Sequence, residues 1–521
     1  MFANRRRSPR TQRISRRPGY SDLASGWGMT MRKSVLLLSV ASLLLAAPVT
    51  ALAQAATPAA AAMRAPVVAI TQHAGTFNGQ KMKYDAIVAE TFLKDAAGAS
   101  AASVVTTAYV RTDNKDKATR PVLFLFNGGP GASTTPLHFG AFGPKKREGE
   151  GAAQRMVDNP DSPLDAVDLV FIDPVGTGYS RPLPGHDGQA FWSRTGDAQA
   201  VKTIIADWLK ANGRQASPRY MLGQSYGTTR AALVAGIGQD LNLDGILLFA
   251  LVGNPPGHEM PYVTSLPAFA TSAWHHQRID RAGRSVTQVY DEAVAFARGE
   301  YVTALIKGAS LTPAEKRATA RKMSALIGLP AEFIEAKDLR LSKEDFMFNL
   351  LKDQGVRIGQ LDGRATRALD APAQRPPYDD PGMSYAAPRP APPAATGVIA
   401  ASKRGLSAVD SYYQEHLKFR TAETYDALNL DVNSAWDHEG MTDVNAKIGD
   451  AMQLNPKLRL FWAAGYFDIT TPAYSGRYAL DQAGVPGERL TAAYFNGGHS
   501  VFTDPANHTA LSQAVRNFVR P

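Results

Sequence analysis

Short continuous runs of apolar residues mark two regions of the chain and are separated by segments with a helical pattern. The runs lie at residues 121–126, 167–172, 245–252 and 458–464. Apolar runs of this length with no polar face predict strands that are buried on both sides, as in a parallel sheet. The helical patterns lie at residues 197–212 and 228–241. Strands that alternate with helices predict an α/β fold with a doubly wound, mostly parallel sheet.

The strand pattern stops between about residues 257 and 435. This stretch has helical patterns at residues 287–306, 313–327 and 342–354, and it is rich in proline from residue 371 to residue 395. Before the first buried run, residues 67–111 are rich in β-forming residues, with alternation at residues 102–110. We therefore predict two core segments, 67–256 and 436–521, with the segment 257–435 inserted between late strands as a helical cap.

The first 55 residues are expected to be a secretory signal and not part of the folded protein. Its parts are the basic Met31-Arg32-Lys33, the apolar run 35–47 and candidate cleavage sites after Ala53 or Ala55. The apolar run is too short to argue for a membrane span in the mature protein, although an uncleaved N-terminal anchor is the alternative. Residues 56–66 follow as an Ala- and Pro-containing linker. We expect an exported protein, periplasmic or secreted.

The positive charge of the chain is concentrated ahead of this signal. The 521 residues include 57 lysines and arginines and 47 acidic residues, a net charge of +10. Residues 1–33 hold nine of the basic residues and one of the acidic ones, which leaves 48 against 46 in the rest. An arginine-rich start is explained most simply by a start codon assigned too early, with Met29 or Met31 as the true start. We therefore expect no nucleic-acid partner, although a strongly basic chain suggests one.

Cysteine is absent from the sequence. Its absence excludes a cysteine nucleophile, cysteine-ligated metals and disulfide bonds. The protein must therefore rely on its hydrophobic core, and its length is ample for one large α/β domain and a second unit. We expect no metal and no cofactor, and the oligomeric state is left open.

The pentapeptide Gly223-Gln224-Ser225-Tyr226-Gly227 carries the most specific chemistry. It lies between the strand-like residues 219–222 and the helix-like residues 228–235. A Gly-x-Ser-x-Gly turn between strand and helix is the nucleophile elbow of an α/β-hydrolase, in which the serine hydroxyl attacks an acyl carbon. A glycine-lined helix start with a capping serine is the alternative interpretation. We predict that Ser225 is a nucleophile.

A serine nucleophile needs a base and a carboxylate, and α/β-hydrolases supply them in the order Ser, Asp or Glu, His. Asp468 lies in the loop that leaves the predicted strand 458–464, and His499 lies in a glycine-rich loop after a strand-like run at 490–495. Taken singly, such residues are often a helix cap and a turn residue. His508 is the other histidine after Asp468, and its helix-start context predicts a surface position. The order and the positions predict that Asp468 and His499 complete a triad with Ser225.

Five motifs together give the sequence a resemblance to a known family. They are Asn127-Gly128-Gly129-Pro130-Gly131, Asp173-Pro174-Val175-Gly176-Thr177-Gly178-Tyr179-Ser180, the pentapeptide 223–227, Gly465-Tyr466-Phe467-Asp468 and Gly498-His499. Over residues 120–255 and 455–505 this series resembles the serine carboxypeptidase family. The resemblance implies an α/β-hydrolase fold, a doubly wound mostly parallel sheet with a helical cap insertion, in a bacterial, exported member of that superfamily.

The resemblance also implies a role for each matching residue. Ser225 would attack the scissile carbonyl, His499 would relay the serine proton, and Asp468 would orient the imidazole. Gly129 and Tyr226 would offer backbone N–H groups to the oxyanion, which is the largest electrostatic contribution available to acyl transfer. The glycine-rich loop fits this role on physical grounds, because side chains there would block the approach of a substrate oxygen.

Departures from the family pattern concern the substrate's terminal carboxylate. The resemblance implies that Asn127 and Gly128 help to hold it, together with two family glutamates. Gln224 and Ala141 stand at the two glutamate positions, and Ala132 replaces a family cysteine. An amide can donate to a carboxylate at any pH, whereas paired carboxyl groups must share a proton. We therefore expect activity near neutral pH, limited at low pH by His499.

The sequence thus predicts a serine-type carboxypeptidase that releases C-terminal residues from peptides. Peptides are the expected partners, and no stable membrane span is expected after signal cleavage. Loss of carboxylate recognition would instead leave an esterase, an acyltransferase or another peptidase on the same triad. An inactive hydrolase-like binding protein is the alternative from a different class, because a shared fold does not fix function.

Overall fold

The computed structural model describes residues 64–371 and 407–520, apart from residues 115, 117 and 150–152. The predicted signal segment and nearly all of the predicted Pro-rich segment lie outside these residues. Among the residues described, no helix is both long enough and apolar enough to cross a membrane.

A central sheet organises the described chain, and its strand order is β1-β2-β3-β7-β4-β9-β10-β13-β14, with β8 paired to β3. The bounds of the first four in chain order are β1 (Val68–Phe77), β2 (Gln80–Lys94), β3 (Ser100–Arg111) and β4 (Val122–Phe126). The others are β7 (Asp168–Ile172), β8 (Arg181–Pro182), β9 (Arg219–Gln224), β10 (Gly245–Phe249), β13 (Arg459–Gly465) and β14 (Leu490–Phe495). The strands from β7 to β14 run parallel, whereas β1, β2 and β3 pair antiparallel. The predicted doubly wound, mostly parallel sheet is confirmed.

Alternate side chains of the parallel strands enter two separate hydrophobic cores, one on each face of the sheet. On β4, Phe124 and Phe126 belong to one core, and Leu123 and Leu125 to the other. The first core is covered by α1 (Arg194–Ala211), α2 (Tyr226–Ile237), α11 (Ala446–Leu454) and α12 (Ala473–Gln482). Helix α13 (Pro505–Val519) packs on the second. Burial on both faces explains why these strands are apolar at every position.

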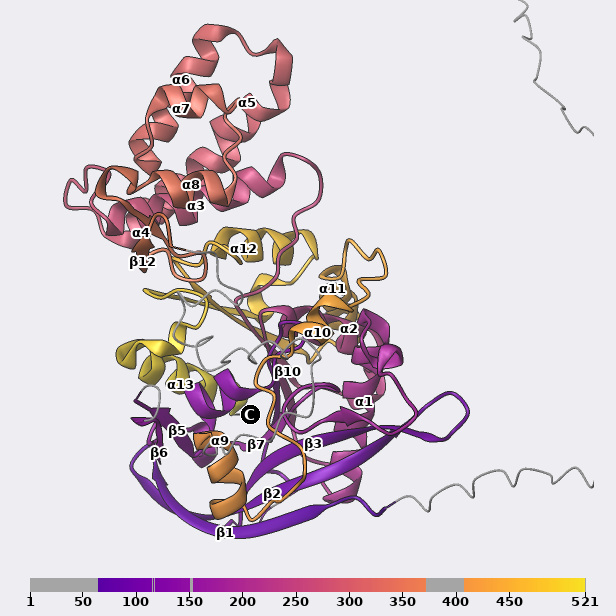
Figure 1. Ribbon diagram of the computed structural model, residues 1–521. Coiled ribbons are helices and arrows are strands. Elements are labelled where there is room, and N and C mark those ends of the chain that lie inside the picture. The colour runs from indigo at the N-terminus through magenta and orange to yellow at the C-terminus, as the bar shows by residue number, and fades with distance from the viewer. Residues whose placement is uncertain (1–63, 115, 117, 150–152, 372–406, 521) are drawn as a thin grey trace, which may run out of the picture. The chain divides into compact units, whose positions relative to one another are not determined.

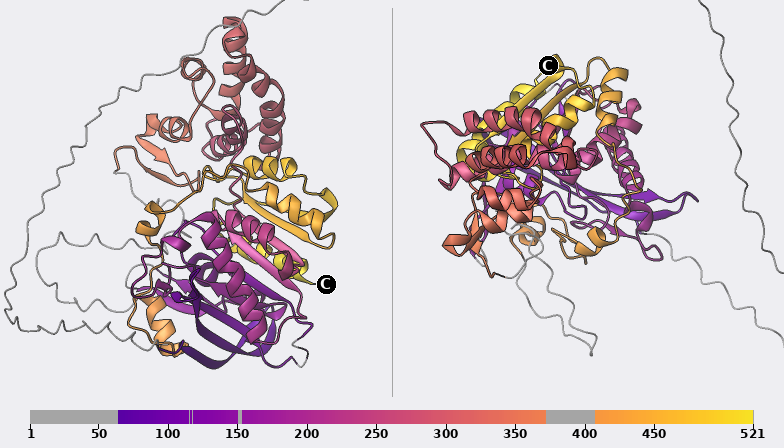
Figure 2. Two further views of the ribbon diagram at one scale, coloured as in Figure 1. Left: turned by 90° about the vertical axis from the view of Figure 1, so that its right-hand side faces the viewer. Right: turned by 90° about the horizontal axis from the view of Figure 1, so that it is seen from above.

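The segment after β10 forms a group of helices with a hydrophobic core of its own. Its elements are α3 (Met260–His275), α4 (Val286–Phe296), α5 (Val302–Lys307), α6 (Pro313–Ile327), α7 (Ala331–Ala336), α8 (Lys343–Asn349) and the hairpin β11 (Val356–Ile358) and β12 (Thr366–Ala368). Capping boxes at Ser285, Thr312 and Ser342 start three of the helices. Figures 1 and 2 show these helices gathered next to α12, which α3 contacts. We call residues 257–371 the cap.

Residues 407–435 pack against the core. They contain α9 (Ala408–Ser411), a π-helical turn (Tyr412–His416) and α10 (Leu430–Ser434). Tyr412 and Tyr413 are buried in the second core, and Figure 1 shows α9 beside β1 and β2. We therefore propose that the cap insertion ends before residue 407, earlier than the limit of 435 that the sequence pattern suggested.

Two further features complete the core region. The hairpin β5 (Lys145–Glu148) and β6 (Arg155–Asp158) follows a π-helical segment at Pro136–Phe142.

A buried ion cluster joins the starts of three neighbouring parallel strands. Asp168, the first residue of β7, accepts from Arg120 Nε at 2.7 Å and from Arg214 Nη1 at 2.6 Å. These three side chains are at most 5% exposed. Removing one of the charges would therefore leave the opposite charge buried without a partner, which is costly.

We predict that Asp168→Asn lowers the free energy of unfolding by about 3–5 kcal/mol, because it leaves two buried guanidinium groups without their counter-charge. Urea denaturation measures the change. Asp158→Asn is the matched control, since Asp158 pairs with Lys145 at the surface and is 82% exposed. That control is expected to change the free energy by no more than about 0.5 kcal/mol. Equal effects of the two substitutions would contradict the assigned role of the cluster.

Candidate active site

Ser225 occupies a strained turn between β9 and α2. Its backbone has φ 58° and ψ −130°, a conformation that non-glycine residues adopt rarely and at a cost of about 1–3 kcal/mol. Its N–H donates to the carbonyl of Phe249 on the neighbouring strand at 3.0 Å. A Cβ atom added at Gly223 would overlap the carbonyl of Gly227, so the turn closes only with glycine there. The structure thus has the strand–turn–helix geometry of a nucleophile elbow.

The loop after β4, residues 127–131, lies directly against this elbow. A Cβ atom added at Gly128 would overlap the backbone nitrogen of Tyr226, and one added at Gly227 would lie 2.8 Å from the carbonyl oxygen of Phe126. Gly129 has φ 98°, which favours glycine. Among the described residues, the N–H groups of Gly129 and Tyr226 donate to no protein acceptor. Two unsatisfied donors, one at the first turn of α2, can therefore serve a developing oxyanion.

A buried arginine holds the 127–131 loop from the side of α2. Arg230 donates to the carbonyl of Asn127 and pairs with Asp197 of α1 at 2.6 Å. Its side chain is 1% exposed. Burial raises the pKa of Asp197, and the charge of Arg230 opposes that rise. Helix α2, which starts directly after Ser225, thus also holds the 127–131 loop.

The segment after α9 holds the same loop from the other side. Asn429 N donates to Gly131 O at 2.8 Å, Asn433 Nδ2 donates to Pro130 O at 2.9 Å, and Ser133 N donates to Ala427 O at 2.9 Å. Sequence reasoning assigned no role to these residues, because their contacts are made mostly through the backbone.

Asp468 and His499 form a buried pair at the carboxyl ends of β13 and β14. His499 Nδ1 lies 2.8 Å from Asp468 Oδ2, and the side chains are 3% and 1% exposed. Asp468 Oδ1 accepts from the N–H groups of Thr470 and Thr471 at 2.9 Å each. The Thr471 hydroxyl donates to Asp468 Oδ2 and lies 3.1 Å from His499 Nδ1. With Nδ1–H directed at the carboxylate, Nε2 carries the lone pair that a general base needs.

Asn127, Gly128 and Gln224, the three residues predicted to bind the substrate carboxylate, lie close together. Gln224 Oε1 accepts from Asn127 Nδ2 at 2.8 Å, and the backbone of Gly128 is adjacent to both. Gln224 is 2% exposed, and its Nε2 donates to Ser500 Oγ at 3.1 Å and to the His499 carbonyl at 3.4 Å. Gln224 therefore links the elbow, the 127–131 loop and the loop after β14 that carries His499, which we call the histidine loop. Sequence reasoning missed Ser500, although it directly follows His499.

Two other positions from the sequence lie apart from these groups. The predicted surface position of His508 is wrong, because its side chain is buried and its Nε2 lies 2.7 Å from the carbonyl of Ala141. Burial lowers the pKa of His508. Ala141 is fully buried, so a glutamate at this position would have needed buried partners.

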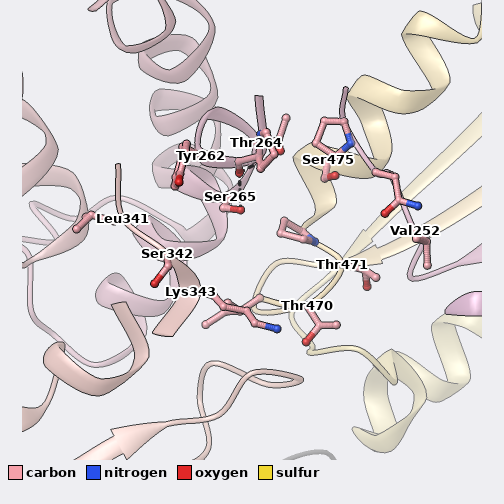
Figure 3. A pocket seen from close by; sticks show the side chains of 16 residues that line it. Val252, Tyr262, Thr264, Ser265, Leu341, Ser342, Lys343, Thr470, Thr471 and Ser475 are labelled. Atoms are coloured by element: carbon pink, nitrogen blue, oxygen red, sulfur yellow. Dashed lines mark hydrogen bonds between the residues drawn. The ribbon is translucent and has the colours of Figure 1, made fainter. Parts of the chain in front are cut away.

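The loop after β13 that carries Asp468 is called the acid loop below. A pocket of about 240 Å³ adjoins it, between the core and the cap (Figure 3). Thr470, Thr471 and Ser475 line it from the core, and Tyr262, Thr264, Ser265 and Lys343 line it from the cap. Thr471 also contacts Asp468 and His499, so one side chain links the pocket lining to the pair. Among the described residues, no cluster of three or more histidine, aspartate or glutamate side chains could hold a metal ion.

The sheet and the strained serine turn give this protein the α/β-hydrolase fold. A family model described as serine carboxypeptidase matches residues 108–312, which include Ser225 but not Asp468 or His499. A serine carboxypeptidase-like protein (number 36) of Arabidopsis thaliana is 32% identical over 151 residues, which are 26% of this chain and 28% of that protein's length. Over these residues the chain is similar to serine carboxypeptidases.

A solved structure with similar architecture agrees with the assigned fold. It is Kex1Δp of Saccharomyces cerevisiae, a prohormone-processing carboxypeptidase, which is 13% identical to this chain. The superposition has a TM-score of 0.51 and covers 83% of this chain and 90% of that one. At this identity the likeness establishes the fold only.

We predict that Gly128→Ala slows the labelling of Ser225 by a fluorophosphonate about 100-fold. The added methyl group would push the 127–131 loop away from Tyr226 N and disturb the oxyanion donors. Gly299→Ala is the matched control, because nothing lies within 4 Å of a Cβ atom there. Circular dichroism confirms that both variants fold. A labelling rate close to wild type in Gly128→Ala would contradict the assigned oxyanion site.

Proposed function

We propose that the protein is a serine-type carboxypeptidase that removes C-terminal residues from peptides through an acyl-enzyme. One observation carries this proposal: the buried Asp468–His499 pair lies at the same sheet edge as the strained Ser225 turn, two and three strands along in the strand order. The match of residues 108–312 to the serine carboxypeptidase family model supports the same reaction class.

In the proposed reaction, Ser225 Oγ attacks the carbonyl carbon of the last peptide bond while His499 Nε2 takes the hydroxyl proton. Asp468 holds the imidazole and stabilises its positive charge. The N–H groups of Gly129 and Tyr226 stabilise the oxyanion of the tetrahedral intermediate. The C–N bond then breaks, and His499 gives its proton to the leaving amine. Water attacks the acyl-enzyme by the same steps and releases the shortened peptide.

The free carboxylate of the substrate is the feature that a carboxypeptidase must recognise. We propose that the Gly128 N–H and the second N–H of Asn127 Nδ2 donate to it. Gln224 was expected to bind the carboxylate directly, but its amide nitrogen is directed at Ser500 and the His499 carbonyl. We therefore assign it an indirect role, in which Gln224 Oε1 orients Asn127.

Replacement of both family glutamates favours one second candidate, an esterase or acyltransferase that no longer requires a free carboxylate. Its triad and oxyanion donors would be the same. Export to the periplasm or the medium also remains a proposal, and it rests on the signal-like pattern of residues 31–55.

We predict that the enzyme cleaves an N-blocked dipeptide with a free terminal carboxylate at least 100-fold faster, in kcat/KM, than the same dipeptide as its C-terminal amide. Hydrogen bonds from Asn127 and Gly128 to the carboxylate are the physical reason, since leaving them unmade is costly. Ser225→Ala is the control and should abolish both turnover and fluorophosphonate labelling. Equal rates for acid and amide would reject the carboxypeptidase and favour the second candidate. Absence of labelling in the wild type would favour a binding protein.

We predict that Gln224→Glu moves the optimum of kcat/KM to acidic pH, whereas the wild-type value stays high from about pH 6 to pH 8. Burial raises the pKa of a carboxyl group at this site, and the His499 carbonyl opposes its ionisation. The protonated form at low pH can still accept from Asn127 and can donate to either Ser500 Oγ or the His499 carbonyl, whereas the ionised form at higher pH can donate to neither. Activity should therefore fall as pH rises through the new pKa. An unchanged profile would contradict the role given to Gln224.

A further inference from the structure

The tip of the β11–β12 hairpin reaches out of the cap and contacts both loops of the proposed acid–base pair. We call residues 359–365, which connect the two strands, the hairpin tip. Gly359 N donates to Ala365 O at 2.9 Å and closes it. Leu361 and Asp362 are 5% and 8% exposed, although they belong to a turn. A hairpin turn normally lies in solvent, so this burial calls for a reason.

Backbone hydrogen bonds join the hairpin tip to the acid loop. Ile469 N, one residue after Asp468, donates to Gln360 O at 3.1 Å. Gly363 N donates to the carbonyl of Phe467, one residue before Asp468, at 2.8 Å. The two residues that flank Asp468 are therefore both tied to the cap.

The hairpin tip is joined just as directly to the histidine loop. His499 N donates to Leu361 O at 2.7 Å. A Cβ atom added at Gly498 would lie 2.5 Å from that same oxygen and 2.7 Å from Asp362 Cβ, so the two backbones are in close contact. The residue that carries the imidazole is thus bonded through its own N–H to the cap.

The Arg364 side chain links the hairpin tip to both loops. Its guanidinium makes a two-point ion pair with Asp362, with Nε 2.9 Å from Oδ1 and Nη2 2.6 Å from Oδ2. Its Nη1 donates to Asn496 O in the histidine loop at 2.9 Å, and the guanidinium lies over the ring of Phe467 at 5.1 Å. Arg364 therefore contacts the acid loop, the histidine loop and the hairpin tip at once. Lysine cannot reproduce this planar, two-point geometry.

We propose that Arg364, with Asp362, is a positioning residue that sets the geometry of His499 against Asp468. The inference rests on the triad proposed above and adds that the cap helps to position the loops that carry Asp468 and His499. Misplacement of a reacting group by about 1 Å can cost about 100-fold in rate. Because the hairpin tip does not contact Asn127 or Gly128 through any hydrogen bond among the described residues, the loss should appear in kcat and not in KM.

The test compares Arg364→Ala and Arg364→Lys with Arg340→Ala in the full chain. Arg340 is the matched control, since it makes a similar two-point pair with Glu259 elsewhere in the cap. Arg364→Ala should lower kcat on the N-blocked dipeptide and the rate of Ser225 labelling by about 30- to 100-fold, with KM within about threefold of wild type. Arg364→Lys should fall between Arg364→Ala and wild type. Arg340→Ala should match wild type in both rates.

Normal rates in Arg364→Ala, or an equal loss in Arg364→Ala and Arg340→Ala, would overturn the proposal. Thermal unfolding of each variant separates loss of geometry from loss of the fold. Should Arg364→Ala fail to fold, Asp362→Asn removes the same ion pair, and a folded Asp362→Asn with normal rates would overturn the proposal equally. A wild type that is labelled but does not cleave the peptide would refute the carboxypeptidase alone, since the labelling rates still test the hairpin tip. A wild type that is not labelled would refute both.

Discussion

Direct contact between two stretches of backbone is the constraint on which the site depends. The turn at Ser225 and the chain at the end of β4 approach so closely that side chains at Gly227 or Gly128 would collide with backbone atoms of the other stretch. This approach is possible because β4 and β9 are neighbours in the sheet and end at the same edge. The proposed nucleophile and the proposed oxyanion donors therefore belong to one rigid unit, and strain at Ser225 is held in place by packing from both sides.

The Asp468–His499 pair, by contrast, is held in place by contacts from several distant parts of the chain. Asp468 and His499 come from loops after β13 and β14, and Gln224 connects them to the elbow. Two segments between β10 and β13 contribute. The hairpin tip of the cap lies against the acid and histidine loops, and residues 427–433, outside the cap, lie against the 127–131 loop. A protein with no cysteine thus links the loops of the proposed site through hydrogen bonds and ion pairs, among them the partly buried Arg364–Asp362 pair.

The sequence predicted those elements whose signal is local. Buried parallel strands are apolar at every position, so β4, β7, β10 and β13 could be located to within a few residues. The elbow was recognisable because its two glycines are required by backbone contact. Contacts made through the backbone by distant segments leave no such pattern. The hairpin tip at Leu361 and the segment around Asn429 contact the site mainly through carbonyl and N–H groups, which every residue has. His508 was misplaced because its burial comes from packing on Ala141, far away in sequence.

The central claim is that Ser225 forms a covalent acyl-enzyme with a substrate that ends in a free carboxylate. Rapid-quench mass spectrometry with an N-blocked depsipeptide tests it directly, because the ester acylates the enzyme faster than water releases the acyl group. The account predicts about one equivalent of the acyl group on the peptide that contains Ser225, and none in Ser225→Ala. Turnover of the depsipeptide without any acyl group on Ser225 would contradict it.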